Sequence, residues 1–147
     1  MSDRATVEQR TYGLLQEILG TVDPPTNGSW MFSFKTVPLG VTIAGDEDPT
    51  VVVFTQVVSD VPKSLELLDC LNEINEKMSF GRIFWAGNSV YIQQVLIGST
   101  VDREELQTAM SSVGEWGDSL DEDLAQRFGS LAQGAPGPPP PGVVSTA

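Results

Sequence analysis

The chain has 147 residues, which is enough for one domain that buries a core without disulfides or metals. Its formal net charge of −12 produces a field that repels phosphate backbones and anionic membrane surfaces, so we expect no nucleic-acid partner. One cysteine and no histidine exclude a disulfide framework, a Cys/His zinc site and a nucleophile activated by imidazole.

The first ten residues carry charge where a secretory signal peptide needs an apolar core, and no segment approaches membrane-spanning length. We therefore expect a cytoplasmic protein without membrane insertion. The first predicted element is a helix whose apolar face comprises Val7, Leu14, Ile18 and Val22, widened by Leu15 and Leu19. Gly20, followed by Asp23-Pro24-Pro25, ends it.

Three strands are predicted next. Apolar residues alternate over Trp30–Phe34 and again over Val37–Ile43, and Thr50–Val58 is a nearly continuous β-branched run typical of a strand covered on both faces. This third strand is the best candidate for the centre of the sheet. Pro38 cannot donate to a ladder and favours an edge position or a bulge.

A second helix and a hairpin follow. Leu67, Leu71, Ile74 and Met78 form one narrow apolar stripe, and Pro62 suits the first turn of a helix that opens near residues 59–62. Asn72 and Asn75 lie on its half-polar flank, where each side chain should have an assigned partner, such as a neighbouring loop. Strands at Arg82–Ala86 and Val90–Ile97 are joined by Gly87-Asn88, a pairing suited to a tight hairpin.

The last predicted helix begins at Asp102, three residues before Glu105, in the pattern of a capping box. Its stripe comprises Leu106, Met110, Val113, Leu120, Leu124 and Phe128, and Gly114 and Gly117 leave open one long helix or two shorter ones. After Gly129 the pattern decays. We expect one domain over residues 1–131 and a disordered Pro/Gly-rich tail over 132–147, whose Pro138-x-x-Pro141 spacing also fits polyproline-reading grooves.

The order helix, three strands, helix, two strands, helix predicts an α+β fold with a mostly antiparallel sheet of about five strands packed by three helices. Nothing in this order carries catalytic chemistry. Cys70 lacks a partner that would lower its pKa, the Asp46-Glu47-Asp48 turn lacks the spacing of a cation loop, and Asp118, Asp121, Glu122 and Asp123 are expected on the wet side of the last helix. No glycine cradle for a phosphate or dinucleotide occurs, so we expect no enzyme, cofactor or metal.

Five aromatic residues are candidate anchors for a bound peptide, although any of them could be core instead. They are Trp30, Phe32, Phe34, Trp85 and Trp116.

The segment Leu-Leu-x-x-Leu-Asn-x-Ile-Asn at 67–75, followed by Phe80-Gly81-Arg82-Ile83 and a hairpin, resembles the bacterial YbjN family, which in turn is similar to CesT-type chaperones of type III secretion. The resemblance implies a non-enzymatic module that binds a protein or peptide client, either as a strand added to a sheet edge or in a groove between helix and sheet. We expect the edge at residues 30–34. The resemblance also implies a homodimer, and the alternative function is a regulatory or sensory-transduction adaptor that binds a folded partner.

Overall fold

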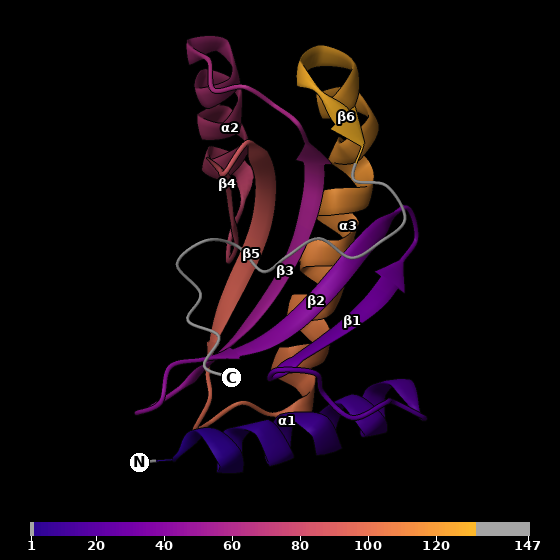
Figure 1. Cartoon of the computed structure of the whole chain (residues 1–147), viewed down its shortest axis with the longest axis vertical. Helices are drawn as coiled ribbons and strands as arrows, with labels where there is room; N and C mark the ends of the chain where they lie inside the picture. Colours follow the sequence, from indigo (N-terminus) through magenta and orange to yellow (C-terminus); the bar gives the residue numbers. More distant parts are fainter. Residues whose placement is uncertain (1, 132–147) are drawn as a thin grey trace.

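Three helices pack against an antiparallel sheet in the computed structural model, which describes residues 2–131 (Figure 1). In chain order the elements are α1 (Arg4–Leu19), β1 (Ser29–Phe34), β2 (Val37–Ala44), β3 (Thr50–Ser59), α2 (Leu65–Lys77), β4 (Arg82–Ala86), β5 (Ser89–Ile97), α3 (Arg103–Phe128) and β6 (Ser130–Leu131). The predicted α+β class and order are confirmed. The two-residue β6 was not predicted, and the proline-rich tail over 132–147 lies outside the described residues.

The strands are arranged in the order β1-β2-β3-β5-β4, and every neighbouring pair is antiparallel. β3 lies at the centre, as its β-branched run predicts, and β6 pairs with its last residues, Val58 and Ser59. Gly87 and Asn88 have φ angles of 56° and 62°, which confirms the tight hairpin between β4 and β5. The two edges of the sheet are therefore β1 and β4.

Pro38 lies in β2, an interior strand, but at a point where that strand is locally an edge, as predicted. The proline is tolerated because β2 pairs with β3 only from Gly40 onward. At Pro38 the strand has a partner on one side alone, Ser33 of β1, and the carbonyl of Pro38 accepts a hydrogen bond from Thr55 Oγ1.

α3 is one continuous helix that lies against one face of the sheet, which settles the choice between one long helix and two shorter ones (Figure 1). The glycines let the helix approach the strands closely. A Cβ at Gly114 would lie 2.5 Å from Phe34 Cδ1, and one at Gly117 would lie 3.0 Å from Thr55 Cγ2. The closeness of packing therefore offsets the poor helix propensity of glycine at these positions.

α1 crosses one end of the sheet, and its buried residues are Val7, Thr11 and Leu15 (Figure 1). The predicted apolar face is largely confirmed, since Val7 and Leu15 are buried and Leu14 and Ile18 pack against the core, whereas Leu19 is exposed. Gly20 ends the helix as predicted, with a φ angle of 87°. The burial of Thr11 was not predicted, because the apolar pattern ignores a polar residue.

α2 lies beside β4 at the other end of the sheet (Figure 1). Its first turn begins after Ser64, whose hydroxyl accepts a hydrogen bond from the Leu67 amide, so the predicted opening at 59–62 is too early. Leu67 and Leu71 are buried as predicted, whereas Ile74 and Met78 are half-buried against the core. The helix therefore covers one corner of the sheet.

Candidate peptide-binding site

The outer edge of β1 carries backbone groups that no strand of the described chain uses. Ser29 exchanges two hydrogen bonds with Thr26, of 3.0 and 3.1 Å, so its amide and carbonyl face away from β2. Backbone direction alternates along an antiparallel strand, so Met31 and Ser33 face the same way. Since β1 ends the strand order, the edge at Met31 and Ser33 is open to an added strand within residues 2–131.

The opposite edge, β4, is closed at Ile83 by a side chain. The Asn75 amide donates to the Ile83 carbonyl and accepts from the Ile83 amide, each at 2.8 Å. This pair of bonds reproduces what a neighbouring strand would make, so Asn75 confirms the expected partner for the helix flank. Asn72, one turn earlier, is exposed, and within residues 2–131 its side chain has no hydrogen-bond partner of the kind predicted.

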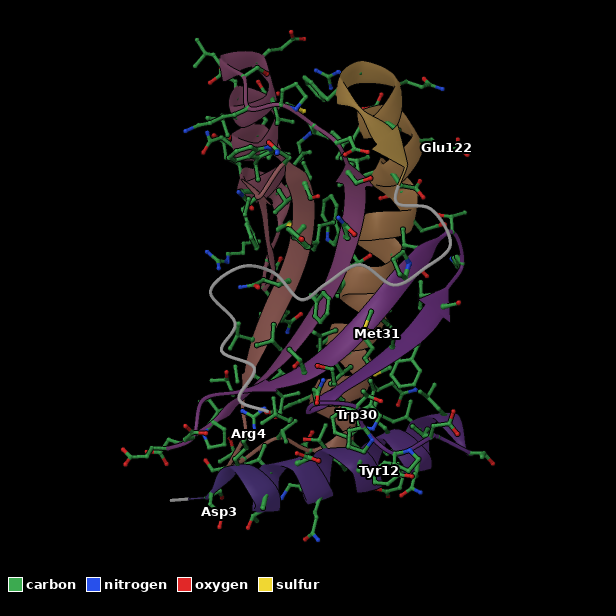
Figure 2. All side chains as sticks on the ribbon, in the orientation of Figure 1. Asp3, Arg4, Tyr12, Trp30, Met31 and Glu122 are labelled. Atoms are coloured by element: carbon green, nitrogen blue, oxygen red, sulfur yellow. The ribbon has the colours of Figure 1, made fainter. Side chains whose placement is uncertain are left out.

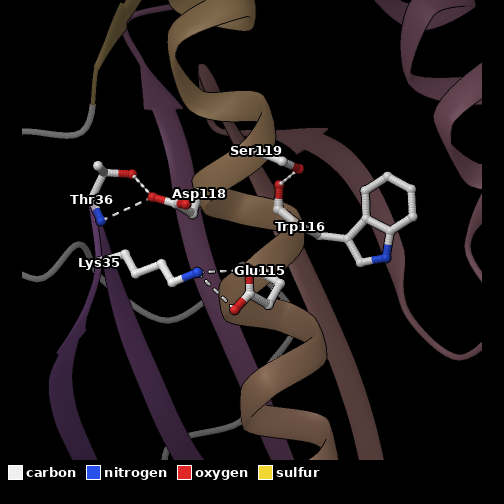
Figure 3. Close-up of polar contacts among 6 residues, drawn as sticks. All are labelled: Lys35, Thr36, Glu115, Trp116, Asp118 and Ser119. Carbon is white, nitrogen blue, oxygen red and sulfur yellow. Dashed lines mark hydrogen bonds and ion pairs between the residues drawn. The ribbon is translucent and has the colours of Figure 1, made fainter.

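The β1–β2 turn is held against α3 by polar contacts (Figure 3). Lys35 Nζ contacts both carboxylate oxygens of Glu115 at 2.9 and 3.0 Å, and the Thr36 amide donates to Asp118 at 3.2 Å. Hydrogen bonds from Thr36 hold the pKa of Asp118 below its ordinary value, and the bond to Glu115 raises the pKa of Lys35. These contacts fix the end of the open edge.

The prediction that the acidic residues of α3 form only a wet face is wrong for two of them. Asp121 is 4% exposed, and its carboxylate lies 2.6 Å from Thr36 Oγ1, whose single proton it shares with the carboxylate of Asp118. Asp118 also accepts from the Thr36 amide. Thr36 and these two aspartates are more than eighty residues apart in the sequence, so no local pattern predicts their contact. Glu122 and Asp123 are exposed as predicted.

Trp30 is a core residue, so its expected role as an exposed anchor needs correction. Its side chain is 3% exposed and packs beside Tyr12 of α1, with ring centroids 6.1 Å apart (Figure 2). The reason is the alternation of β1, which turns Trp30 toward the helices. In this conformation the indole is covered and is not available to a client.

Phe32 and Phe34 lie on the open edge strand and are half-buried, on the helix side of the sheet. The Phe34 ring packs on Gly114, and Lys35 Nζ lies 5.9 Å from its centroid. A strand added at Met31 and Ser33 would pass directly beside these two rings, because residues of adjacent strands on one face are neighbours.

Trp85 and Trp116 are not part of that edge. Trp85 lies on β4 at the opposite end of the strand order, and its indole N–H donates to the Val61 carbonyl at 2.7 Å. Trp116 projects from α3 away from the β1–β2 turn (Figure 3). The five predicted aromatic residues are thus divided among the core, the β1 edge and two other places.

The sequence predicted residues 30–34 as the edge, and the strand order confirms that β1 is an edge. It did not show that Met31 and Ser33 are the residues whose backbone faces outward, because this depends on the pairing register with β2. Sequence reasoning also missed the cation beside Cys70. Arg127 donates to Cys70 Sγ at 3.4 Å, and the sulfur and then Asp123 raise the pKa of Arg127. Cys70 itself is buried in the core.

Within residues 2–131, no group of three or more metal-ligating side chains gathers at one place. The Asp46-Glu47-Asp48 turn between β2 and β3 is exposed. Two carboxyl groups have shifted pKa values, Asp3 and Asp118, and hydrogen bonds with Thr6 and Thr36 lower both. In the same part of the chain, no helix is both long and apolar enough to span a membrane.

Comparison with known proteins gives the fold a family. The family of T3SS (YopN, CesT) and YbjN peptide-binding chaperones, type 1, matches residues 5–132. The chain belongs to this family. The family confirms the resemblance seen in the segment from Leu67 onward. No curated protein matches the chain.

Two solved structures share the fold of this family member. A chain of the crystal structure of the ExsC–ExsE complex superposes with a TM-score of 0.63 at 11% identity, covering 83% of this chain and 96% of the other. A chain of the HopA1–SchA chaperone–effector complex superposes with a TM-score of 0.62 at 9% identity, covering 83% and 99%. At these identities the likeness shows the fold alone.

Proposed function

We propose that this protein is a cytoplasmic, non-enzymatic chaperone that holds an extended segment of a client polypeptide as an added strand along β1. The observation that carries the proposal is the open edge at Met31 and Ser33, beside Phe32 and Phe34. The family supports a peptide client, and both structural relatives come from complexes, one of them described as chaperone–effector.

The geometry favours β1 over β4 for this role. Asn75 already occupies the outward groups of Ile83, whereas Ser29 is the only β1 residue whose outward backbone groups are bonded within the described chain. The turn contacts of Lys35 and Thr36 with α3 keep the strand in place before a client arrives. A rigid edge binds an extended segment with a smaller entropy loss than a mobile one.

A photocrosslinking residue at Ser33 tests the proposal while the identity of the client is still unknown. We expect crosslinks from position 33 to unfolded or terminal segments of a few recurrent partners, and none from the same residue at exposed Glu122. One folded partner at a fixed ratio would instead favour the alternative function, a regulatory adaptor. Crosslinks of equal yield from both positions would contradict the edge.

A matched pair of variants at Ser33 removes or keeps its outward backbone amide. Ser33→Pro deletes an outward amide that bonds nothing in the described chain, and proline is compatible with an edge strand. Ser33→Ala removes only the hydroxyl. We expect the proline variant to fold and to lose client binding, and the alanine variant to bind like the parent.

A homodimer is the second part of this proposal. Leu65 is 76% exposed on the outward flank of α2, and Leu68 on the same flank is also exposed. Apolar side chains grouped on an uncovered helix are typical of an interface between chains. Sedimentation of the parent and of a Leu65→Glu, Leu68→Glu variant tests it: we expect a dimer that the variant dissociates, and a parent that sediments as a monomer would refute it.

A further inference from the structure

β4 covers only part of its neighbour. Its five residues pair with Ser89–Gln93, so the following stretch of β5, residues 94–97, is paired with β3 alone. Ile83 bonds Asn75 instead of β5, and by alternation the backbone of Gln93 and of Val95 then faces the β4 side. Gln93 faces Arg82 there, whereas Val95 faces no strand within residues 2–131.

An open pocket of about 620 Å³ lies at this place, and we call it the β5 notch. It lies between residues 94–97, the chain at Phe80 just before β4, and the start of α3 at residues 102–108. Four residues of extended chain span about 13 Å, which sets the length of segment that could pair with this half of β5.

The apolar wall of the notch is unusually exposed. Phe80 is 76% exposed, Ile97 is 67% exposed and Val95 is 50% exposed, and all three line the same cavity. Contiguous apolar side chains on the surface of a chain with net charge −12 mark an interaction site.

The opposite wall is acidic. Asp102, Glu104 and Glu105 line the notch from the first turn of α3, and no lysine or arginine is among the lining residues. Gln94 adds a buried side-chain oxygen for which the described chain supplies no donor. Both features select a ligand that brings hydrogen-bond donors and positive charge.

The two faces of the sheet impose a pattern on that ligand. Thr55 packs toward Gly117 of α3. Side chains alternate along β3, so Val53 lies on the same side of the sheet as Thr55. Gln94 is the cross-strand partner of Val53 and therefore also lies on the helix side. Val95 and Ile97 therefore lie on the other side. A strand added here would turn every second residue toward the carboxylates and the rest toward Val95 and Ile97.

The geometry points to the β5 notch as a second strand-docking site, for an extended client segment in which lysine or arginine alternates with apolar residues. The inference rests on the proposed function, since it takes the ligand to be a client polypeptide. It differs in place and in chemistry from the β1 edge, whose open backbone groups lie beside the Phe32 and Phe34 rings.

The test uses the full chain and a synthetic probe, the dye-labelled peptide Lys-Val-Lys-Val-Lys-Val-Lys, with Glu-Val-Glu-Val-Glu-Val-Glu as its control. Amide NMR shifts place the bound peptide, and fluorescence anisotropy measures its affinity. We expect the lysine peptide to shift the amides of Val95 and Ile97 and to bind at least tenfold more tightly than the glutamate peptide.

Two variant pairs assign the contacts. Val95→Pro removes the backbone amide of Val95, which has no strand partner within residues 2–131, and should weaken binding of the lysine peptide at least tenfold. Val95→Thr keeps this amide and should bind the peptide like the parent. Glu104→Gln with Glu105→Gln should weaken it several-fold, whereas Glu73→Gln with Glu76→Gln, the same charge change on exposed positions of α2, should leave it unaltered.

The β1 variants separate this inference from the proposed function. An unchanged affinity of Val95→Pro for the lysine peptide, or peptide-induced shifts confined to Met31 and Ser33, would overturn the notch as a docking site. The proposal for the β1 edge would then be unaffected. Loss of client binding in Ser33→Pro with the notch peptide still bound would support both. Concentration-dependent shifts at Val95 and Ile97 without any peptide would assign the notch to a second copy and overturn the inference.

Discussion

The side chain of Asn75 completes the hydrogen bonding of Ile83, with one bond to its amide and one to its carbonyl, both at 2.8 Å. Asn75 thereby attaches α2 to β4 and occupies the outward backbone groups of one residue on that edge. Because Ile83 bonds away from β5, alternation along the ladder turns the backbone of Gln93 and Val95 toward the β4 side.

Asn75→Ala should lower the free energy of unfolding by about 1–3 kcal/mol, because two hydrogen bonds are lost and two backbone groups lose their partner. Asn72→Ala is the control on the same helix, and since this residue is exposed we expect a change within about 0.5 kcal/mol. Urea unfolding measures both. Equal effects of the two substitutions would mean that Asn75 does not close the edge.

The residues of the apolar stripe of α2 should contribute unequally to the free energy of unfolding. Leu71 is buried, and Leu71→Ala should cost about 2–5 kcal/mol, whereas half-buried Ile74→Ala should cost less than about 2 kcal/mol. Leu65→Ala, on the exposed flank, should change stability by less than about 0.5 kcal/mol in the monomer. Thermal or urea unfolding at low protein concentration gives the ranking, and a reversed order would refute this placement of the helix.

Gly114 is required where α3 meets β1. A Cβ there would lie 2.5 Å from the Phe34 ring, so Gly114→Ala should destabilise the protein by about 1–3 kcal/mol despite the better helix propensity of alanine. Gly13→Ala in α1 is the matched control, because a Cβ there meets nothing within 4 Å. It should stabilise by up to about 1 kcal/mol. Opposite signs in the melting temperatures check the prediction.

The helices and strands follow from periodicity, since burial of one face imposes a period that the sequence records directly. β3 was predicted from its continuous β-branched run, and the hairpin from the turn residues Gly87-Asn88. The burial of Thr11 in α1 was not predicted, because this residue is buried without being apolar. Of the site, the edge at residues 30–34 was predicted, but which backbone groups face outward depends on the pairing register, which residue types do not encode.

The notch beyond β4 had a signal in the sequence, the unequal lengths of the two strands that flank Gly87-Asn88. The docking of the β1–β2 turn had none, because Thr36 and Asp121 meet only after the sheet and α3 have packed. Contacts of this kind are tertiary and follow from the assembled fold.

The link between Thr36 and Asp118 predicts a pH dependence. The hydrogen bonds keep the pKa of Asp118 below its ordinary 3.8, so the stabilisation is fully present above that value and is lost as pH falls through the lower folded-state pKa. The stability difference between the parent and Thr36→Val should therefore shrink in acid. Ser119→Ala, which removes a hydroxyl bonded only to the Trp116 carbonyl, should give a difference independent of pH in that window (Figure 3).

Amide hydrogen exchange on the complex with the client segment recovered through Ser33 tests the central claim most directly. If the client is an added strand, the amides of Met31 and Ser33 should exchange at least tenfold more slowly in the complex, because each gains a hydrogen-bond partner. The Ser29 amide, already bonded to Thr26, is the internal control and should change little. Unaltered exchange at Met31 and Ser33 in a saturated complex would contradict strand addition at β1.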